Sequence, residues 1–266
     1  MESNTTLVQS FPAHAASPRS PGPFPAIVLF HDHFGLGPST RAVANRFARE
    51  GFYLLAPNFY ALPSSFASVA PEFMRSQTVA FYGPSEEEAA LERSRTLTDE
   101  RTALIFDQAV RYLDGRAVVR PGAFGVIGFG TGARRALGAA CALPARVNAC
   151  VLVAPDGVGE ADPLPPGQAD PLEAAASLAA PVLLLYGGLD TEAREPERER
   201  VRGRLASLGK PVTLEILRGA GPGFFFSDRE GYRARASRTA WDESLSFLKN
   251  ALDAPKAIVK GQGPVV

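Results

Sequence analysis

Short apolar runs alternate with amphipathic segments along most of this 266-residue chain. The runs are rich in Val, Ile, Leu and Phe and show no polar alternation, which is typical of strands buried on both faces. This pattern predicts strands at residues 26–30, 52–57, 124–129, 147–155, 181–187 and 212–217.

Between these runs, apolar residues recur every three or four positions, which predicts amphipathic helices. The expected helical segments are residues 40–50, 86–113 (long enough for two helices), 133–142, 196–208 and 234–252. Gly51 follows the first segment as a C-cap signal, and Pro196 suits the first turn of a helix. Strands that alternate with helices in this way predict an α/β fold, with a mostly parallel sheet flanked by helices on both faces.

The pattern predicts one domain with two flanking segments. Residues 1–24 are rich in Ser, Pro and Thr, and we expect an irregular lead-in with one short edge strand near residues 6–10. Residues 25–252 form the α/β domain, and residues 253–266 form a C-terminal tail. The proline-rich stretch 162–171 is typical of a surface loop.

The overall composition points to a globular protein with no polyanionic partner. Lys plus Arg and Asp plus Glu both number 28, so the balance favours neither nucleic acid nor an anionic membrane. No apolar run approaches the roughly 20 residues that span a bilayer, and the N-terminus lacks the basic-then-apolar pattern of a signal peptide. We expect a cytoplasmic protein, and the sequence does not determine its oligomeric state.

The two cysteines, Cys141 and Cys150, lie in apolar surroundings, one in a predicted helix and one in a predicted strand. This placement predicts two buried free thiols rather than a disulfide or a reactive nucleophile. Their spacing does not match a metal site.

The strongest chemical signal follows the strand at residues 124–129. Gly128-Phe129-Gly130-Thr131-Gly132 leads from that strand directly into a helix, which is the context of the nucleophile elbow G-x-S-x-G. In open parallel sheets, sites form at this carboxyl edge. The central position would carry the nucleophile, and here it is Gly130, which has no side chain.

Five segments together resemble the dienelactone hydrolases of the α/β-hydrolase superfamily. They are residues 25–61, VIGFGTGARRAL, PVLLLYGGLD, GAGPGFFF and FSDREGYRARASRTAWDESLSFLK, and they follow one another in order from about residue 23 to residue 250. Members of this family hydrolyse small lactones and esters with a Cys or Ser, an Asp and a His.

The resemblance implies a family role for particular positions. It assigns the nucleophile position to Gly130, the triad acid to Asp190 and the histidine position to Pro222. It assigns a family glutamate to Asp32.

The family's oxyanion hole would come from the backbone N–H groups of His33 and Thr131. Neither donor depends on the identity of its side chain, so we expect that hole to be kept.

These substitutions remove the chemistry of the triad. Glycine cannot attack a carbonyl carbon and proline cannot accept a proton, so we predict a pseudoenzyme that does not hydrolyse esters by this route. The remaining histidines, His14, His31 and His33, all precede the second buried strand, and none can follow the last strand. We predict no cofactor.

Two interpretations of the His31-Asp32-His33 stretch stay open. In the functional interpretation, His33 or His31 acts as a base on a bound water, or His31, Asp32 and His33 contribute to a metal site. A ligand beyond a pair is not evident in the sequence, and we predict no metal. The other interpretation is structural, with the side chains capping a strand end and hydrogen-bonding to loop backbone. Asp190 has the same two interpretations, as part of a site or as a hydrogen-bond acceptor that stabilises its loop.

Aromatic residues are frequent in the segments expected around the elbow: Phe34, Phe59, Tyr60, Phe81, Tyr82 and Phe224 to Phe226. Together they favour a hydrophobic or aromatic small-molecule ligand, although each one alone is equally typical of core packing. The leading hypothesis is therefore a non-hydrolytic protein that binds a small molecule or a partner. The alternative is an atypical enzyme, either a hydrolase of a small ester or lactone or a lyase, isomerase or cyclase, that uses Asp32, His31 or His33. A third hypothesis is a scaffold subunit.

Overall fold

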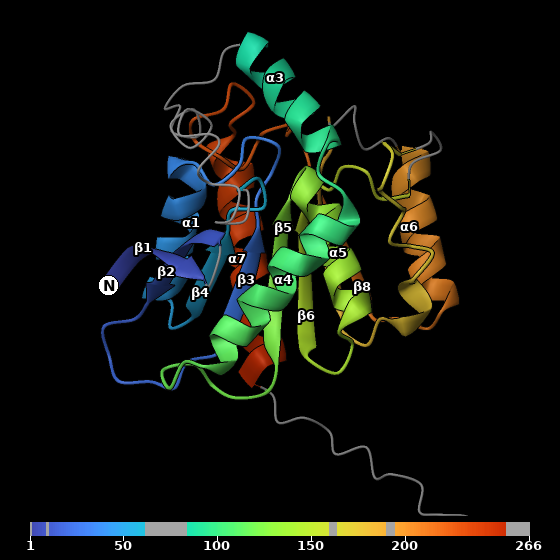
Figure 1. The fold of residues 1–266 in the computed structure, drawn as a ribbon. Helices are drawn as coiled ribbons and strands as arrows, with labels where there is room; N and C mark the ends of the chain where they lie inside the picture. The colour runs from blue at the N-terminus through green and yellow to red at the C-terminus, as the bar shows by residue number, and fades with distance from the viewer. Residues whose placement is uncertain (1, 9–10, 62–83, 160–163, 190–194, 254–266) are drawn as a thin grey trace, which may run out of the picture.

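An eight-stranded sheet in the order β1-β2-β4-β3-β5-β6-β7-β8 runs through the protein (Figure 1). The computed structural model describes residues 2–8, 11–61, 84–159, 164–189 and 195–253. The strands are Glu2–Val8 (β1), Phe11–Ser17 (β2), Ala26–Phe30 (β3), Tyr53–Pro57 (β4), Phe124–Phe129 (β5), Val147–Val153 (β6), Val182–Gly187 (β7) and Val212–Leu217 (β8). The strands β3 to β8 are mutually parallel, and β1 and β2 are antiparallel to their neighbours.

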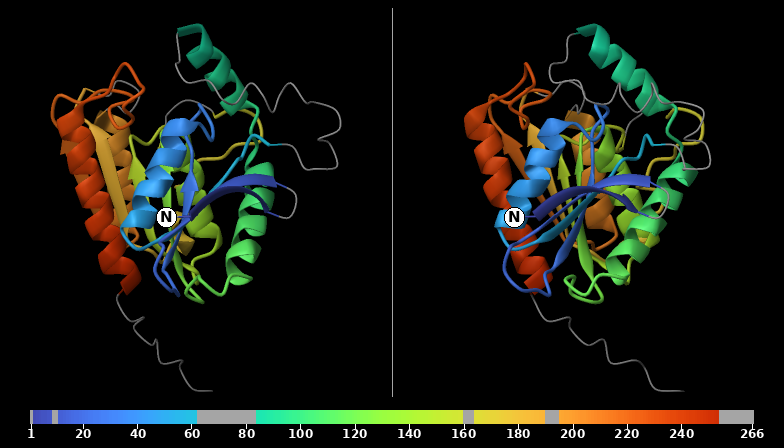
Figure 2. Two further views of the ribbon diagram at one scale, coloured as in Figure 1. Left: turned by 90° about the vertical axis from the view of Figure 1, so that its left-hand side faces the viewer. Right: turned by 60° about the vertical axis from the view of Figure 1, so that its left-hand side comes forward.

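Helices cover both faces of the sheet. They are Pro38–Arg49 (α1), Pro84–Arg95 (α3), Asp99–Asp114 (α4), Thr131–Ala142 (α5), Glu195–Ser207 (α6) and Ala234–Asp253 (α7), with a 3-10 turn at Ala175–Ser177 (η2). Figure 2 shows α1 and α7 together on one face and α4 on the other. Residues that alternate along β3 belong to the two opposite cores, because successive side chains of a strand point to opposite faces. The α/β class predicted from the apolar pattern is therefore confirmed.

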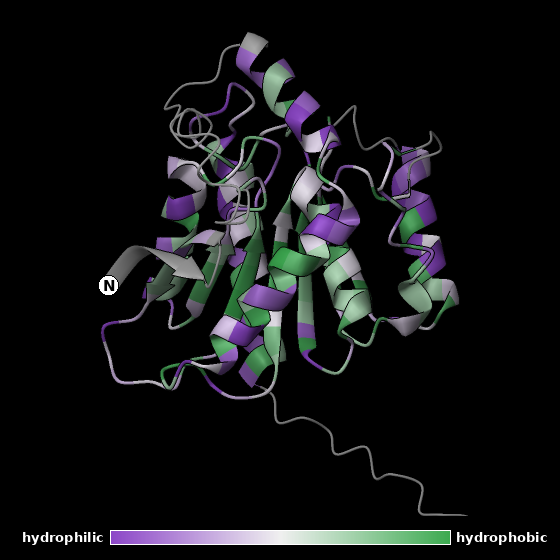
Figure 3. Ribbon diagram, viewed as in Figure 1, coloured by the Kyte–Doolittle hydropathy of each residue, from purple (hydrophilic) through white to green (hydrophobic). Residues whose placement is uncertain are grey.

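The hydropathy of the elements explains this layering. The central strands are apolar, while the helices alternate apolar and polar positions (Figure 3). Every residue of β3, β4, β5 and β7 is buried. The predicted segment 86–113 does form two helices, and the side chain of Thr98 caps the second one by accepting a hydrogen bond from the Arg101 N–H at 3.2 Å. No helix in the described ranges is long and apolar enough to cross a bilayer.

The expectation of an irregular lead-in at residues 1–24 is wrong. Strands β1 and β2 form an antiparallel ribbon, and β2 pairs with β4 from Ala13↔Pro57 to Ala16↔Leu54. The signal was weak because β2 reads FPAHAAS, which lacks the β-branched residues typical of strands. The ribbon forms because β2 satisfies the backbone groups along the otherwise open edge of β4. At the other end, α7 finishes at Asp253, and residues 254–266 lie outside the described residues.

Candidate functional site

The turn between β5 and α5 has the geometry predicted for an elbow. Gly130 lies between the last strand residue and the first helix residue with φ 51° and ψ −125°. A side chain is rarely found at such a φ, and glycine adopts it at little cost. A Cβ placed at Gly130 would meet only the Asp32 Cβ, at 3.4 Å. The position is therefore strained for other residues, but it is not crowded.

The two flanking glycines allow the close approach that the motif predicted. A Cβ at Gly128 would lie 2.5 Å from the Ala133 Cα, and a Cβ at Gly132 would overlap the His31 carbonyl and lie 2.5 Å from the Phe30 carbonyl oxygen. These contacts are to backbone, which cannot move aside easily. The glycines thus bring the end of β3 against the start of α5.

A cavity of about 440 Å³ opens at this carboxyl edge of the sheet. Loops that follow β3, β5, β6, β7 and β8 contribute to its lining, together with α3. The lining residues are Asp32, His33, Phe34, Glu87, Phe129, Gly130, Val153, Ala154, Asp156, Leu189, Gly221, Pro222, Gly223, Phe224, Phe225, Phe226, Arg229, Glu230, Gly231 and Arg233. None of these described residues is a Ser, Thr, Cys or Lys, so the lining offers no hydroxyl, thiol or amine nucleophile.

Aromatic side chains form the apolar wall, as the sequence predicted in part. Phe34 and Phe224 to Phe226 line the cavity, and Phe129 lies 4.9 Å and 5.0 Å from Phe225 and Phe226 between ring centroids. Phe59 and Tyr60 belong to the core instead, where Phe59 stacks on Phe30 at 4.7 Å. Phe81 and Tyr82 lie outside the described residues.

A buried ion pair between Asp32 and Arg229 lies in the cavity lining. The Asp32 Oδ1 accepts a hydrogen bond from the Phe34 N–H at 3.0 Å, and Oδ2 lies 3.3 Å from Arg229 Nη2. Both side chains are only 8% exposed, and the Arg229 guanidinium also stacks 3.8 Å above the Phe34 ring. The sequence analysis missed Arg229, because one arginine within a polar segment has no distinguishing pattern.

His33 lies beside this pair and faces α3. Its Nε2 is 3.7 Å from Glu87 Oε1, which is within ion-pair range but too long for a hydrogen bond. Burial lowers the pKa of His33, against the opposite influence of the Asp32 and Glu87 carboxylates. The imidazole is therefore neutral near pH 7, the form that can accept a proton.

His31 has the structural role. Its Nδ1 lies 2.9 Å from the Asp32 carbonyl oxygen, and its Nε2 accepts the Phe59 N–H at 3.1 Å. Burial lowers its pKa to about 4, so both nitrogens are committed to backbone in the neutral form. These contacts favour the structural interpretation of His31, in which the ring holds loop backbone, over the interpretation as a base or metal ligand. The described residues contain no group of three or more His, Cys, Asp or Glu side chains that could hold a metal.

The remaining predicted site residues separate into three groups. Pro222 lines the cavity together with Gly130, as expected. Thr131 does not line it, and its side chain belongs to a second, smaller pocket. Asp190 lies outside the described residues, so its pairing with the Pro222 loop stays a prediction.

The cysteines are core residues, as predicted. Cys141 and Cys150 are free, buried thiols. Burial raises the pKa of the Cys141 thiol to about 11 and raises that of Cys150 as well. Neither is activated as a nucleophile, because the thiolate is the reactive form.

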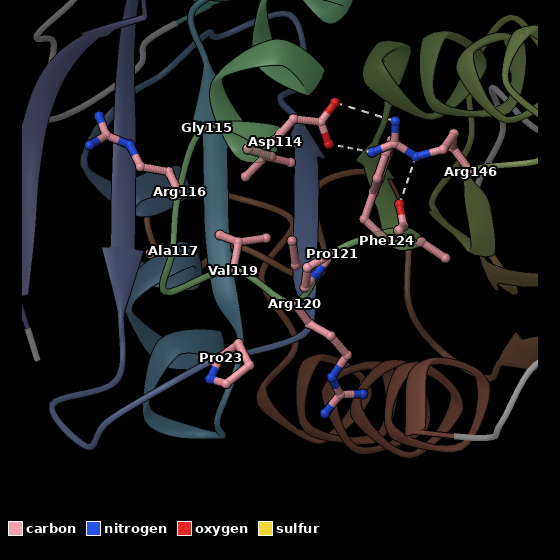
Figure 4. Close-up of a pocket in the computed structure, with 14 residues that line it drawn as sticks. Pro23, Asp114, Gly115, Arg116, Ala117, Val119, Arg120, Pro121, Phe124 and Arg146 are labelled. Atoms are coloured by element: carbon pink, nitrogen blue, oxygen red, sulfur yellow. Dashed lines mark hydrogen bonds and ion pairs between the residues drawn. The ribbon is translucent and has the colours of Figure 1, made fainter.

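A pocket of about 380 Å³ lies at the opposite, amino edge of the sheet (Figure 4). Its basic residues already have protein partners. Arg146 contacts both oxygens of Asp114, at 2.6 and 3.3 Å, and donates to the Gly122 carbonyl at 2.6 Å. Arg120 donates to the Leu252 carbonyl at 3.1 Å near the end of α7. These contacts tie elements together, so the carboxyl edge is the better candidate for a functional site.

Comparisons with known proteins identify similar sequences and a similar fold. The model of the dienelactone hydrolase family matches residues 11–252. A "Putative carboxymethylenebutenolidase" of Methylorubrum extorquens is 29% identical over 238 residues, covering 90% of this chain and 76% of that protein. A "Probable 2-oxo-3-(5-oxofuran-2-ylidene)propanoate lactonase" of Bradyrhizobium is 27% identical over 237 residues, covering 89% of this chain and 88% of that protein.

The fold has a solved counterpart. A crystal structure described as a putative dienelactone hydrolase from Klebsiella pneumoniae superposes with a TM-score of 0.77 at 22% identity, covering 93% of this chain and 98% of the other. At this identity the likeness shows the fold alone.

Proposed function

Since this chain belongs to the dienelactone hydrolase family but carries glycine at its elbow, we propose that it binds a small molecule in the 440 Å³ cavity without triad hydrolysis. The observation that carries the proposal is the combination of an open cavity with a Gly130 turn that offers no nucleophile. Hydrolysis through a covalent intermediate needs a nucleophile and a base to activate it. The described lining provides no hydroxyl, thiol or amine nucleophile, while its shape and aromatic walls are those of a ligand pocket.

The chemistry of the lining favours a planar, unsaturated ligand. Phe34, Phe129 and Phe224 to Phe226 offer flat apolar surfaces, and Arg229 and Arg233 add donors at the same cavity. The name of the Bradyrhizobium relative describes a furanone ring joined to a propanoate, which is planar and carries a carboxylate. We propose a ligand of this class, a small unsaturated lactone or the corresponding acid.

A thermal unfolding screen tests the binding. Unsaturated lactones and planar acids are added at increasing concentration, and a ligand at about 100 times its Kd should stabilise the fold by about 2.7 kcal/mol. Gly221→Leu should abolish the shift, because Gly221 lines the cavity and a Cβ there meets only Leu189 atoms at 3.8 and 4.0 Å. The matched control is Gly203→Leu on α6, where a Cβ meets nothing within 4 Å. Equal shifts in both variants would place the ligand elsewhere and refute the proposal.

One observation favours a second candidate function, acid–base catalysis by His33. Its neutral imidazole lines the cavity with Nε2 toward Glu87, an arrangement that resembles a base held by a carboxylate. Asp32 suits this role less well, because Arg229 holds its carboxylate. Such a pair could remove a proton next to a ligand carbonyl without any covalent intermediate.

This second candidate has its own test. In D₂O, a bound lactone with a saturated carbon next to its carbonyl should exchange a hydrogen on that carbon, and the exchange should disappear in His33→Ala and slow in Glu87→Gln. Exchange at the buffer rate in the wild-type protein would exclude it.

A further inference from the structure

A second pocket lies beside the elbow, and the proposed function does not use it. Its volume is about 220 Å³, and its lining includes Thr131, Arg134, Arg135, Asp156 and Gln168. Gly130 lines the 440 Å³ cavity, Thr131 lines the smaller pocket, and Asp156 lines both. The two pockets are therefore neighbours at the start of α5.

Arg135 is buried in this pocket without an acidic partner. The residue is 5% exposed, and its Nη1 and Nη2 donate to the carbonyls of Thr131 at 3.0 Å and Ser94 at 3.1 Å. Its Nε is buried and has no hydrogen-bond partner within the part of the chain that the structure describes. No described carboxylate lies within ion-pair distance of it.

The preceding residue, Arg134, is buried to the same extent but has an acidic partner. Arg134 contacts both oxygens of Asp99, at 2.8 and 3.2 Å, and donates to the Ala169 carbonyl at 2.9 Å. Buried arginines are ordinarily satisfied in this way, since an unpaired buried donor costs about 1–3 kcal/mol. In contrast to Arg134, the Arg135 Nε is a buried donor without an acceptor among the described residues.

Thr131 contributes a second unused group. Its Oγ1 is buried and has no partner among the described residues. Both groups belong to the first turns of α5, where the helix dipole adds a partial positive charge. Gln168 does not satisfy them, because its Nε2 donates to the carbonyls of Ser94, Arg95 and Leu97 at 3.3, 3.1 and 3.1 Å.

We propose that this pocket binds a small carboxylate monoanion, which accepts hydrogen bonds from Arg135 Nε and Thr131 Oγ1 at the N-terminus of α5. The pocket volume suits an acid of a few heavy atoms. The Asp156 carboxylate on the same lining favours one negative charge over two. The site takes a different ligand from the aromatic cavity, and it stands whether or not that cavity binds a lactone.

The charge state of Arg135 supports this assignment. Its pKa is lowered to about 10, mainly by burial and to a smaller extent by the Arg134 charge, against the influence of Tyr60, Asp99 and Asp156. The surrounding protein therefore leaves the guanidinium charge incompletely compensated. A bound carboxylate would stabilise the charged form.

Arginine Nε–H resonances provide the direct test. Acetate is titrated into ¹⁵N-labelled protein at constant ionic strength, with chloride as the matched salt. The resonance that disappears in Arg135→Lys should shift saturably with acetate and should not respond to chloride. Thr131→Val, which keeps the side-chain shape, should weaken acetate binding roughly tenfold or more, as expected for one hydrogen bond to a charged group. Thr239→Val on exposed α7 is the control and should leave the affinity unchanged.

Two results would overturn the proposal. A shift that is equal in acetate and chloride would mean that the two groups do not select a carboxylate. Unchanged acetate affinity in Thr131→Val would mean that the anion binds elsewhere. If Arg135→Lys fails to fold, the Thr131→Val comparison still decides the matter, because its Oγ1 makes no contact that the described fold requires.

Discussion

The two edges of the sheet differ in how completely their polar groups are paired. At the amino edge, Arg146 and Arg120 have protein acceptors, and their contacts hold loops and the end of α7 together. At the carboxyl edge, His33 Nε2, Thr131 Oγ1 and Arg135 Nε are buried without hydrogen-bond partners among the described residues. Stability alone does not explain unsatisfied groups, because native folds pair nearly all of them. The difference favours the carboxyl edge, where Gly130 offers no nucleophile, as the ligand site of this fold.

The carboxyl edge also has the backbone geometry of an elbow turn. Gly130 has the positive φ of an elbow residue although no side chain requires it, and Gly128 and Gly132 make close backbone contacts on either side. The turn is thus specified by the three glycines and does not depend on a side chain at position 130. Four substitutions or pairs of substitutions test this contrast.

Gly132→Ala should give the largest loss of stability. Its Cβ would overlap the His31 carbonyl, so β3 and α5 would have to separate, at a cost of about 4 kcal/mol or more. Gly138→Ala in the same helix is the control, because its nearest neighbour would be Pro171 Cβ at 4.0 Å, and we expect a gain of roughly 0.5–1 kcal/mol. Urea unfolding measures both, and similar stabilities would contradict the close-approach argument.

Arg229→Met should cost about 3 kcal/mol, because it leaves the buried Asp32 carboxylate without its cation. The matched change at the amino edge, Arg146→Met, should cost less than about 1 kcal/mol, since that side chain is 31% exposed and its partner Asp114 is 49% exposed. Chemical denaturation of both variants compares the two edges directly. The double variant Asp32→Asn with Arg229→Met should recover part of the loss.

Acid should destabilise the protein through His31. Its folded pKa of about 4 lies below the ordinary value of 6.5, so the unfolded chain binds the proton more readily. The stabilising contribution is complete above pH 6.5 and is lost as the pH falls toward 4, by about 3 kcal/mol. His31→Gln should flatten the decrease in unfolding free energy between pH 6.5 and 4.5. An unchanged slope would show that other groups cause it.

Gly130→Cys should have the smallest effect on stability, about 1 kcal/mol, from φ strain without steric overlap. Combined with Pro222→His, it should give a thiol that is alkylated faster than a free cysteine, provided that the introduced imidazole reaches it. Alkylation at the ordinary rate would show that the loop around Pro222 no longer supports triad geometry.

The sequence predicted the sheet well because buried parallel strands leave a clear apolar signal. The strands at residues 26–30, 124–129 and 212–217 begin and end where expected. The β1–β2 ribbon was missed because its pairing depends on the open edge of β4, which is a tertiary contact without a local pattern. The elbow turn was predictable for the opposite reason, since Gly128, Gly130 and Gly132 encode it locally.

Side-chain partners in the site were less predictable. The ion pair of Asp32 with Arg229 joins residues that are distant in sequence, and no spacing rule connects them. His31 and His33 looked equivalent in the sequence, but one contacts loop backbone and the other lines the cavity beside Glu87. Only the tertiary fold distinguishes the two residues.

The most direct test of the central claim is a single-turnover incubation with an unsaturated lactone, analysed by mass spectrometry. With protein in excess, the account predicts that the lactone is retained by the wild-type protein and recovered intact, and that Gly221→Leu does not retain it. Formation of the ring-opened acid faster than in buffer would contradict the account. If that formation then disappeared in His33→Ala, it would identify the acid–base candidate as the correct function.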